Sequence, residues 1–384
     1  MTRRVMIPLT TRGNYAKMRS TMAAIAARDD LELLPVVGGP LLDAGYGDHR
    51  EMLAADGFGA VDELDYLDGP ADLAGMTRAA GRCVLAMQEI IARRWPDWLM
   101  VVADRYEALA IAQAALCMNV RIAHLEGGEV SGSIDERIRH AITKLAHLHF
   151  PANREAAARL ERMGEPGDAI VTVGTPSLDL IAGMELGDLA ATAAFLATNA
   201  TGRSVDLDKP FLVISFHPVV TEVDDAPAQF AMLADAVRRL GLPSVWVLPN
   251  RDAGAGAAAE PVDALLADSG APAVQRIGSL PIEHYARLLA NAACVVGNSS
   301  SGLRESAFLG APTVNIGTRQ QGRARGANVA DVGHDLDRIV AAVEGQITHG
   351  RYPRDGLYGD GAAGPKIAAA LAAHWPALDK TIVY

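Results

Sequence analysis

The chain has 384 residues, half of them hydrophobic, which is enough for two domains with a sizeable core. Its 35 Lys and Arg against 46 Asp and Glu give a formal net charge of −11, which argues against a nucleic-acid-binding surface and a polybasic membrane anchor, though not against a bound anionic small molecule. Three widely spaced cysteines argue against a disulfide framework, and the lack of a signal-peptide pattern or a long apolar stretch predicts a cytoplasmic protein without a membrane span.

In the first half of the chain, short apolar runs alternate with segments of helical periodicity. The expected strands are residues 5–10, 31–37, 98–103, 120–125 and 149–151, and the expected helices are residues 15–27, 107–117, 136–148 and 154–162. Brief apolar strands that alternate with helices predict a parallel sheet covered by helices on both faces.

The second half repeats this alternation. Its expected strands are residues 211–216, 244–248, 294–297 and 313–316, and its expected helices are residues 230–240, 282–291 and 302–309. The segment 174–202 is expected to be partly helical and to lack a strand, so we place a domain boundary within residues 177–187. Two α/β domains in sequence predict a ligand cleft near the carboxyl ends of their strands.

Polar residues directly after strands are therefore the candidate site residues. Arg12 follows the first strand, in a Gly-containing turn that leads into a helix, and this turn is also compatible with an ordinary connection. Asp104 and Arg105 follow the strand 98–103, where Asp104 is either a cleft residue or a helix N-cap.

The densest polar cluster is residues 124–140, which leave one strand and enter a helix. Glu126 closes the strand, two glycines follow, and Asp135 and Arg139 share one face of the helix. Three carboxylates, those of Asp104, Glu126 and Asp135, suit proton transfer because crowding raises some of their pKa values.

The second half offers phosphate-binding chemistry. His217 follows its first strand, and residues 297–306 place Ser299 and Ser300 at the expected start of a helix, where hydroxyl and N–H donors suit phosphate oxygens. A Ser-rich N-cap is the structural alternative. Glu305 is placed one turn later, suited to ribose hydroxyls, and Arg319 follows the strand 313–316.

Several familiar motifs are absent from the sequence. It contains no GxxxxGK[ST], no GxGxxG after the first strand and no HExxH, which argues against an ATP loop, a dinucleotide site and a zinc protease. The ten histidines form no convincing metal constellation, so we expect no metal.

Five sequence blocks resemble the hydrolysing UDP-N-acetylglucosamine 2-epimerases. They are DRYE at 104–107, IAHLEGGEVSGSIDE at 122–136, RHAITKLAH at 139–147, GNSSSGLRE at 297–305 and NIGTRQQGR at 315–323. The block around Glu126 favours the hydrolysing branch, since non-hydrolysing relatives carry a Glu-Ala-Gly-Leu-Arg type sequence there. The resemblance extends over about residues 4–345.

The resemblance implies a GT-B architecture of two Rossmann-like domains with a deep cleft, without cofactor, in a homodimer or homotetramer. The implied domains are residues 1–178 on the sugar side and 179–364 on the UDP side, with residues 365–384 returning to the first domain. The implied reaction eliminates UDP from UDP-N-acetylglucosamine, leaving a 2-acetamidoglucal, and then adds water to give the N-acetylmannosamine used in sialic acid synthesis.

The resemblance also implies roles for individual residues. The implied catalytic residues are Asp104, Glu126, Asp135 and His217, and the implied UDP and substrate contacts are Arg12, Arg105, Arg139, Asn250, Ser279, Ser299, Ser300, Gly302, Glu305 and Arg319.

Three departures from the family pattern bear on the sugar. They are Val102 and Ala103 before the Asp-Arg pair, and Pro40 in the loop after the second strand. The alternatives are the same reaction on a 2,4-diacetamido-trideoxy sugar or an antibiotic precursor, a non-hydrolysing 2-epimerase, a GT-B glycosyltransferase and a catalytically silent nucleotide-sugar sensor.

Overall fold

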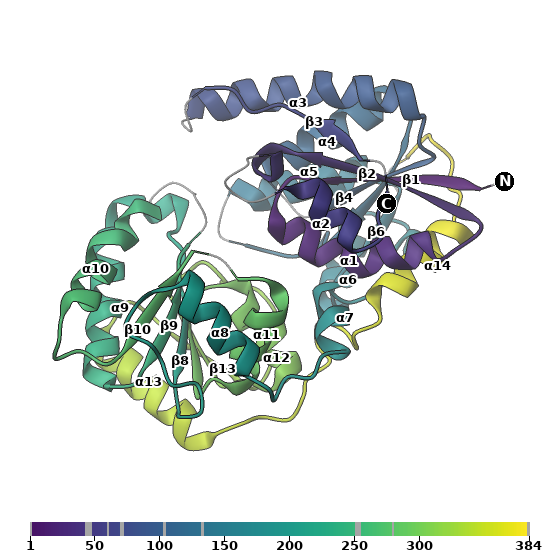
Figure 1. Ribbon diagram of the computed structural model, residues 1–384. Helices are drawn as coiled ribbons and strands as arrows, with labels where there is room; N and C mark the ends of the chain where they lie inside the picture. The colour runs from purple at the N-terminus through teal and green to yellow at the C-terminus, as the bar shows by residue number, and fades with distance from the viewer. Residues whose placement is uncertain are drawn as a thin grey trace. The chain divides into compact units, whose positions relative to one another are not determined.

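The computed structural model describes residues 2–42, 48–59, 61–69, 73–102, 105–131, 134–249, 255–278 and 280–381. The chain divides into two compact units (Figure 1). The first unit comprises residues 1–129, 134–182 and 359–384, and the second comprises residues 130–133 and 183–358.

The described part of the first unit contains a six-stranded parallel sheet in the order β3-β2-β1-β4-β5-β6. Its strands are β1 Arg3–Leu9, β2 Leu31–Gly38, β3 Asp62–Leu64, β4 Trp98–Val102, β5 Arg121–Leu125 and β6 Leu148–Phe150. Its helices are α1 Arg12–Ala26, α2 His49–Ala55, α3 Leu73–Arg94, α4 Tyr106–Cys117, α5 Ile134–Leu145, α6 Arg154–Arg162, α7 Ser177–Ala182 and α14 Ala363–Ala373.

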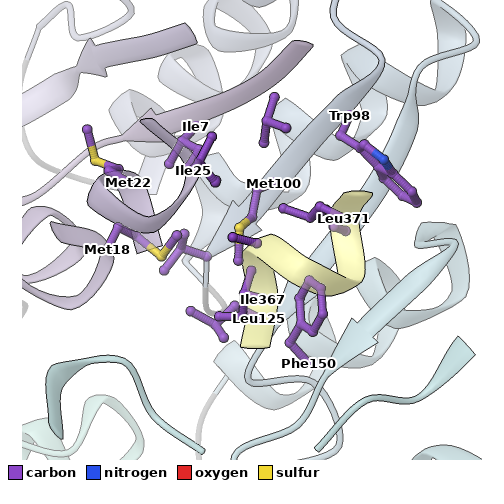
Figure 2. Close-up of a cluster of buried hydrophobic side chains, with 14 of the residues drawn as sticks. Ile7, Met18, Met22, Ile25, Trp98, Met100, Leu125, Phe150, Ile367 and Leu371 are labelled. Atoms are coloured by element: carbon purple, nitrogen blue, oxygen red, sulfur yellow. The ribbon is translucent and has the colours of Figure 1, made fainter. Parts of the chain in front are cut away.

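Both faces of this sheet are buried, as the apolar strands predict. Along β1, Ile7 packs into a cluster with residues of α1 and α14, and its neighbour Met6 packs on the other face with residues of α3 and α4. The first cluster, with Met18, Met22 and Ile367 around Ile7, is drawn in Figure 2.

The C-terminal helix completes the first unit, which confirms the expectation that the chain returns there. Ile367 and Leu371 of α14 are fully buried in the cluster of Figure 2. The Asp179 carboxylate of α7 accepts hydrogen bonds from the backbone N–H groups of Ala363 and Gly364, at 2.8 and 2.7 Å. Because Asp179 holds the start of α14, residues 179–182 and 359–364 lie in the first unit, whereas the expected boundaries follow residues 178 and 364.

Gly364 lets α14 approach α1 closely. A Cβ at this position would lie 2.8 Å from the carbonyl carbon and oxygen of Ser20. We expect Gly364→Ala to lower the free energy of unfolding by about 1–3 kcal/mol, since the backbones must separate. The exposed Gly345 of α13 (Leu336–His349) has open space around it, so Gly345→Ala is the control and should raise stability by about 0.5–1 kcal/mol. Urea unfolding measures both, and a Gly364→Ala protein as stable as the control would contradict the prediction.

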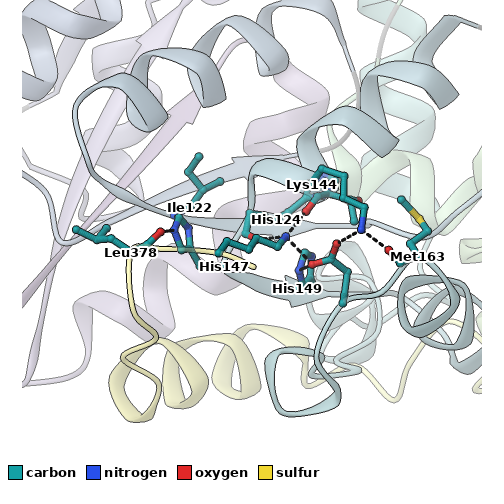
Figure 3. Close-up of polar contacts among 11 residues, drawn as sticks. Ile122, His124, Lys144, His147, His149, Met163 and Leu378 are labelled. Atoms are coloured by element: carbon teal, nitrogen blue, oxygen red, sulfur yellow. Dashed lines mark hydrogen bonds and ion pairs between the residues drawn. The ribbon is translucent and has the colours of Figure 1, made fainter. Parts of the chain in front are cut away.

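The segment after α14 is anchored to the end of α5 and to Glu165. The Lys380 ammonium donates to the carbonyls of Thr143 and Ala146 at the end of α5, at 2.9 and 2.6 Å, and pairs with Glu165 at 2.5 Å. Burial alone would raise the pKa of Glu165, but hydrogen bonds from His149, Lys144 and Lys380 lower it to about 2. Burial lowers the pKa of Lys380 in spite of this pairing. Figure 3 shows the surrounding contacts, including the bond between His147 and the Leu378 carbonyl.

The described part of the second unit contains a seven-stranded sheet in the order β13-β12-β11-β8-β9-β10-β7. Its strands are β7 Thr201–Gly202, β8 Leu212–Ser215, β9 Ser244–Val247, β10 Val274–Ile277, β11 Cys294–Gly297, β12 Thr313–Ile316 and β13 Val329–Val332. Its other helices are α8 Ala190–Asn199, α9 Ala226–Leu240, α10 Ala259–Ala267, α11 Ile282–Asn291 and α12 Glu305–Leu309. Its core includes Phe230 of α9 and Trp246 of β9.

Three expectations about individual elements are wrong. The segment 174–202 ends in the strand β7, which pairs antiparallel with β10, and Gly202 permits this because a Cβ there would lie 2.2 Å from the Val274 carbonyl oxygen. Helix α5 ends at Leu145, because His147 already donates its N–H to Ile122 of β5 and Leu148 begins β6. The helix expected from residue 302 begins at Glu305, after a 3-10 turn over Ser300–Gly302.

No helix in the described ranges has both the length and the apolar character needed to cross a membrane.

Candidate functional site

In the first unit, the candidate residues follow neighbouring strands. The strands β1, β4 and β5 are adjacent and parallel, so the residues that follow them lie together at the carboxyl ends of these strands. Arg12 begins α1 after β1, Arg105 precedes α4 after β4, and Glu126 follows β5 directly. Asp104 lies outside the described residues.

Glu126 is held in a fixed, buried position. Its backbone adopts a φ of 64°, which is uncommon for a residue other than glycine, and its side chain is only 4% exposed. One carboxylate oxygen accepts a hydrogen bond from the Lys17 ammonium at 2.7 Å, and the other accepts one from the Thr175 hydroxyl at 3.0 Å. The ion pair compensates the buried charge, and the two contacts fix where the carboxylate oxygens lie.

The turn after Glu126 needs its glycines. Gly128 has a φ of 78°, and a Cβ there would lie 2.2 Å from the Ala156 carbonyl oxygen, so the turn packs directly against α6. The buried Arg139 side chain donates to the Glu129 carbonyl at 2.8 Å and ties the first turns of α5 to the same segment. Asp135 lies half-buried in the first turn of α5.

Arg105 is oriented by a residue of its own motif. Its Nε donates to the Glu107 carboxylate at 2.8 Å, and Glu107 is 1% exposed, whereas the Arg105 side chain is 39% exposed. A buried carboxylate therefore fixes a guanidinium that reaches the surface at the carboxyl end of β4.

In the second unit, Asn298 joins three loops that follow the adjacent strands β8, β11 and β12. Its side chain accepts from the His217 N–H at 2.7 Å and donates to the His217 carbonyl at 2.8 Å. Its own carbonyl accepts from the Arg319 and Gln320 side chains, at 3.1 and 2.8 Å. His217, Ser299 and Arg319 are therefore brought together in this unit.

His217 is a neutral imidazole at neutral pH. Burial, and to a smaller extent the nearby Arg319 charge, lowers the pKa of His217 to about 3. Within the described residues, no hydrogen-bond partner faces its Nδ1 atom. An uncharged imidazole can donate one N–H hydrogen bond and accept another.

The serine-rich turn lies beside this histidine. Ser299 caps the 3-10 turn, and Ser215, Gly297, Ser299 and Gly302 line one narrow crevice at the ends of β8 and β11. Ser300 and Glu305 are both half-buried. Asn250 and Ser279 lie outside the described residues, as does the side chain of Arg12.

The sequence missed the residues that hold this site together. Lys17 and Thr175 carried no motif signal, whereas Glu107, Asn298 and Gln320 belonged to recognised blocks without a role of their own. Across the described ranges, no group of three or more His, Cys, Asp or Glu residues is arranged to hold a metal ion.

Comparison with known proteins gives a consistent picture. A family model described as UDP-N-acetylglucosamine 2-epimerase matches residues 23–372. The hydrolysing UDP-N,N'-diacetylbacillosamine 2-epimerase of Legionella pneumophila is 33% identical over 361 residues, which cover 94% of this chain and 93% of the relative. The UDP-N-acetylglucosamine 2-epimerase of Neisseria meningitidis is 28% identical over 360 residues, covering 94% of this chain and 91% of the relative.

Solved structures share the fold. The Neisseria meningitidis UDP-GlcNAc 2-epimerase bound to UDP-GlcNAc has a TM-score of 0.78 at 15% identity, covering 97% of this chain and 100% of that one. The Methanocaldococcus jannaschii UDP-GlcNAc 2-epimerase in complex with UDP-GlcNAc and UDP has a TM-score of 0.75 at 17% identity, with the same coverage. The prediction of an α/β fold with two Rossmann-like domains of the GT-B class is confirmed.

Proposed function

Because the chain belongs to the UDP-N-acetylglucosamine 2-epimerase family, we propose that it is a hydrolysing 2-epimerase of a UDP-activated 2-acetamido sugar. The observation that carries this proposal is the turn at Glu126, whose carboxylate is fixed by Lys17 and Thr175. This turn lies in the block where the sequence favours the hydrolysing branch, and the Legionella relative is named as a hydrolysing enzyme. We also propose that the enzyme forms a homodimer or a homotetramer and acts in the cytoplasm.

The proposed reaction has two stages. A carboxylate removes the C2 proton, the C1–O bond breaks with its electron pair going to the departing UDP, and a 2-acetamidoglucal forms by anti elimination. Water then adds to C1, and C2 is protonated from the opposite face. The products are UDP and the sugar with inverted configuration at C2.

The proposed roles follow from the chemistry of each group. Asp104, Glu126 and Asp135 act as base and acid, since both stages move a proton at C2. The neutral His217 donates an N–H hydrogen bond to the leaving diphosphate. The remaining UDP and sugar contacts are assigned to Arg12, Arg105, Arg139, Asn250, Ser279, Ser299, Ser300, Gly302, Glu305 and Arg319.

For the sugar, UDP-N,N'-diacetylbacillosamine is our first candidate. The 33% identity to the Legionella enzyme and the 27% identity to a Campylobacter jejuni GDP/UDP-N,N'-diacetylbacillosamine 2-epimerase support it. UDP-N-acetylglucosamine, which leads to N-acetylmannosamine for sialic acid synthesis, is the second candidate, supported by the 28% identical Neisseria enzyme.

Isotope labelling tests the reaction and the sugar together. The purified enzyme is incubated with each UDP-sugar in deuterated water enriched in heavy oxygen. We expect free UDP without heavy oxygen, and a sugar with deuterium at C2 and heavy oxygen at C1, because the C1–O bond breaks. An intact UDP-sugar with deuterium at C2 would establish the non-hydrolysing reaction instead. The ratio of kcat/KM for the two sugars, expected to favour the diacetamido sugar, decides between the candidates.

A further inference from the structure

A chain of three hydroxyl groups runs from α11 into the serine-rich turn of the second unit. The Tyr285 hydroxyl lies 2.6 Å from Ser301 Oγ, and Ser301 Oγ donates to Ser299 Oγ at 2.9 Å. The Ser301 backbone N–H also donates to Ser299 Oγ, at 3.4 Å. Ser301 is buried, and Ser299 is half-buried at the carboxyl end of β11.

The phenol of Tyr285 remains a donor at neutral pH. Its ring is partly exposed, but its hydroxyl end lies among the serine side chains, and burial raises the pKa of Tyr285. Hydrogen bonds that Ser301, Ser215 and Ser299 can give to the ionised phenolate only partly offset this effect.

The number of protons on the three hydroxyl groups fixes which of them donates to which. Each hydroxyl carries one proton and two lone pairs. Ser301 gives its proton to Ser299, so the proton between Tyr285 and Ser301 must come from Tyr285. Ser299 Oγ then accepts two hydrogen bonds from Ser301, which occupy both of its lone pairs. The proton of Ser299 therefore points away from Ser301.

We propose that Tyr285 is a positioning residue that directs the Ser299 hydroxyl proton toward a phosphate oxygen of the bound UDP-sugar. This inference rests on the proposed function, in which Ser299 contacts the diphosphate. Without the phenol, Ser301 loses its donor and its hydroxyl is free to rotate. Ser299 can then donate back to Ser301, and the anion loses a directed hydrogen bond.

Calorimetric binding of UDP, inorganic pyrophosphate and uridine to the full chain tests this inference. We expect Tyr285→Phe to weaken the binding of UDP and pyrophosphate about ten- to a hundredfold, as for one lost hydrogen bond to a charged group, with little change for uridine. Ser301→Ala should behave alike, and the double variant should be no worse than either, because the residues act in one chain. Tyr352→Phe is the matched control, since its hydroxyl donates to Gln346 at 2.9 Å in the same unit.

The outcomes separate this inference from the proposed function. If wild type binds UDP and pyrophosphate but folded Tyr285→Phe and Ser301→Ala bind them equally well, the inference is overturned and the proposed function stands. An equal loss for uridine would also overturn it, because that would indicate general damage to the unit. If wild type binds neither UDP nor pyrophosphate, the proposed function fails, and this inference fails with it.

Discussion

Asp135→Asn is expected to lower kcat about a thousandfold and to change the Kd for UDP by less than about twofold. The amide keeps the shape of the carboxylate but cannot take up or release a proton, and general acid–base catalysis typically contributes about 10²–10⁴-fold. Asp135 lies in the first turn of α5, and that helix is tied to the Glu126 block through Arg139. Steady-state kinetics and UDP calorimetry on the same preparation measure the two effects.

Glu136→Gln is the matched control for this variant. Glu136 is the next residue of α5 and pairs with His140 at 3.5 Å on the helix surface. The change removes a neighbouring carboxylate without touching the proposed proton transfer, so kcat should stay within about twofold, as surface pairs contribute little. Wild-type turnover in Asp135→Asn, or an equal loss of kcat in both variants, would show that Asp135 is not one of the acid–base residues.

Asn298→Ala is expected to lower kcat/KM about a hundredfold or more, through both a lower kcat and weaker UDP binding. The Asn298 side chain is 1% exposed and satisfies both backbone groups of His217. Without it, the His217 N–H and carbonyl lose their partners and the loop shifts, and a displacement of about 1 Å can cost about a hundredfold in rate. Lost buried hydrogen bonds should also reduce the free energy of unfolding by about 2–3 kcal/mol.

Asn328→Ala separates lost stability from lost positioning. Asn328 is 2% exposed and donates to the Ala311 carbonyl at 2.8 Å, near the start of β12, whereas Asn298 follows the end of β11. Both variants should lose similar stability in urea unfolding, but activity per folded Asn328→Ala molecule should stay near wild type. The role given to Asn298 would be wrong if both variants lost activity to the same extent.

The central strands could be predicted from the sequence, because parallel strands buried on both faces are short, continuous apolar runs. The runs that become β4, β8 and β11 are of this kind. Among the edge strands, β6 was expected at residues 149–151, whereas β3 and β13 were missed. β3 is Asp-Glu-Leu and β13 is Val-Ala-Asp-Val, and both lie at an edge of their sheet with polar, partly exposed residues.

The site was predictable only to the level of its motifs. Glu126 and His217 could be selected because each follows an apolar run, a local signal. The contacts that hold them could not be predicted, because Lys17 is 109 positions from Glu126 and Asn298 is 81 positions from His217. Such contacts depend on which strands become neighbours, and that order is not a property of any one segment.

The return of α14 to the first unit has a consequence for synthesis on the ribosome. Ile367 and Leu371 lie in the same core as β1, and the Trp375 ring packs against the Arg121 guanidinium at 3.6 Å. Residues 183–358 emerge before this segment, so the second unit has its sequence complete while the first still lacks a helix of its core. The unit whose translation begins first is therefore the one whose folding is completed last, and its apolar cluster stays open to chaperones until residues 359–384 have emerged.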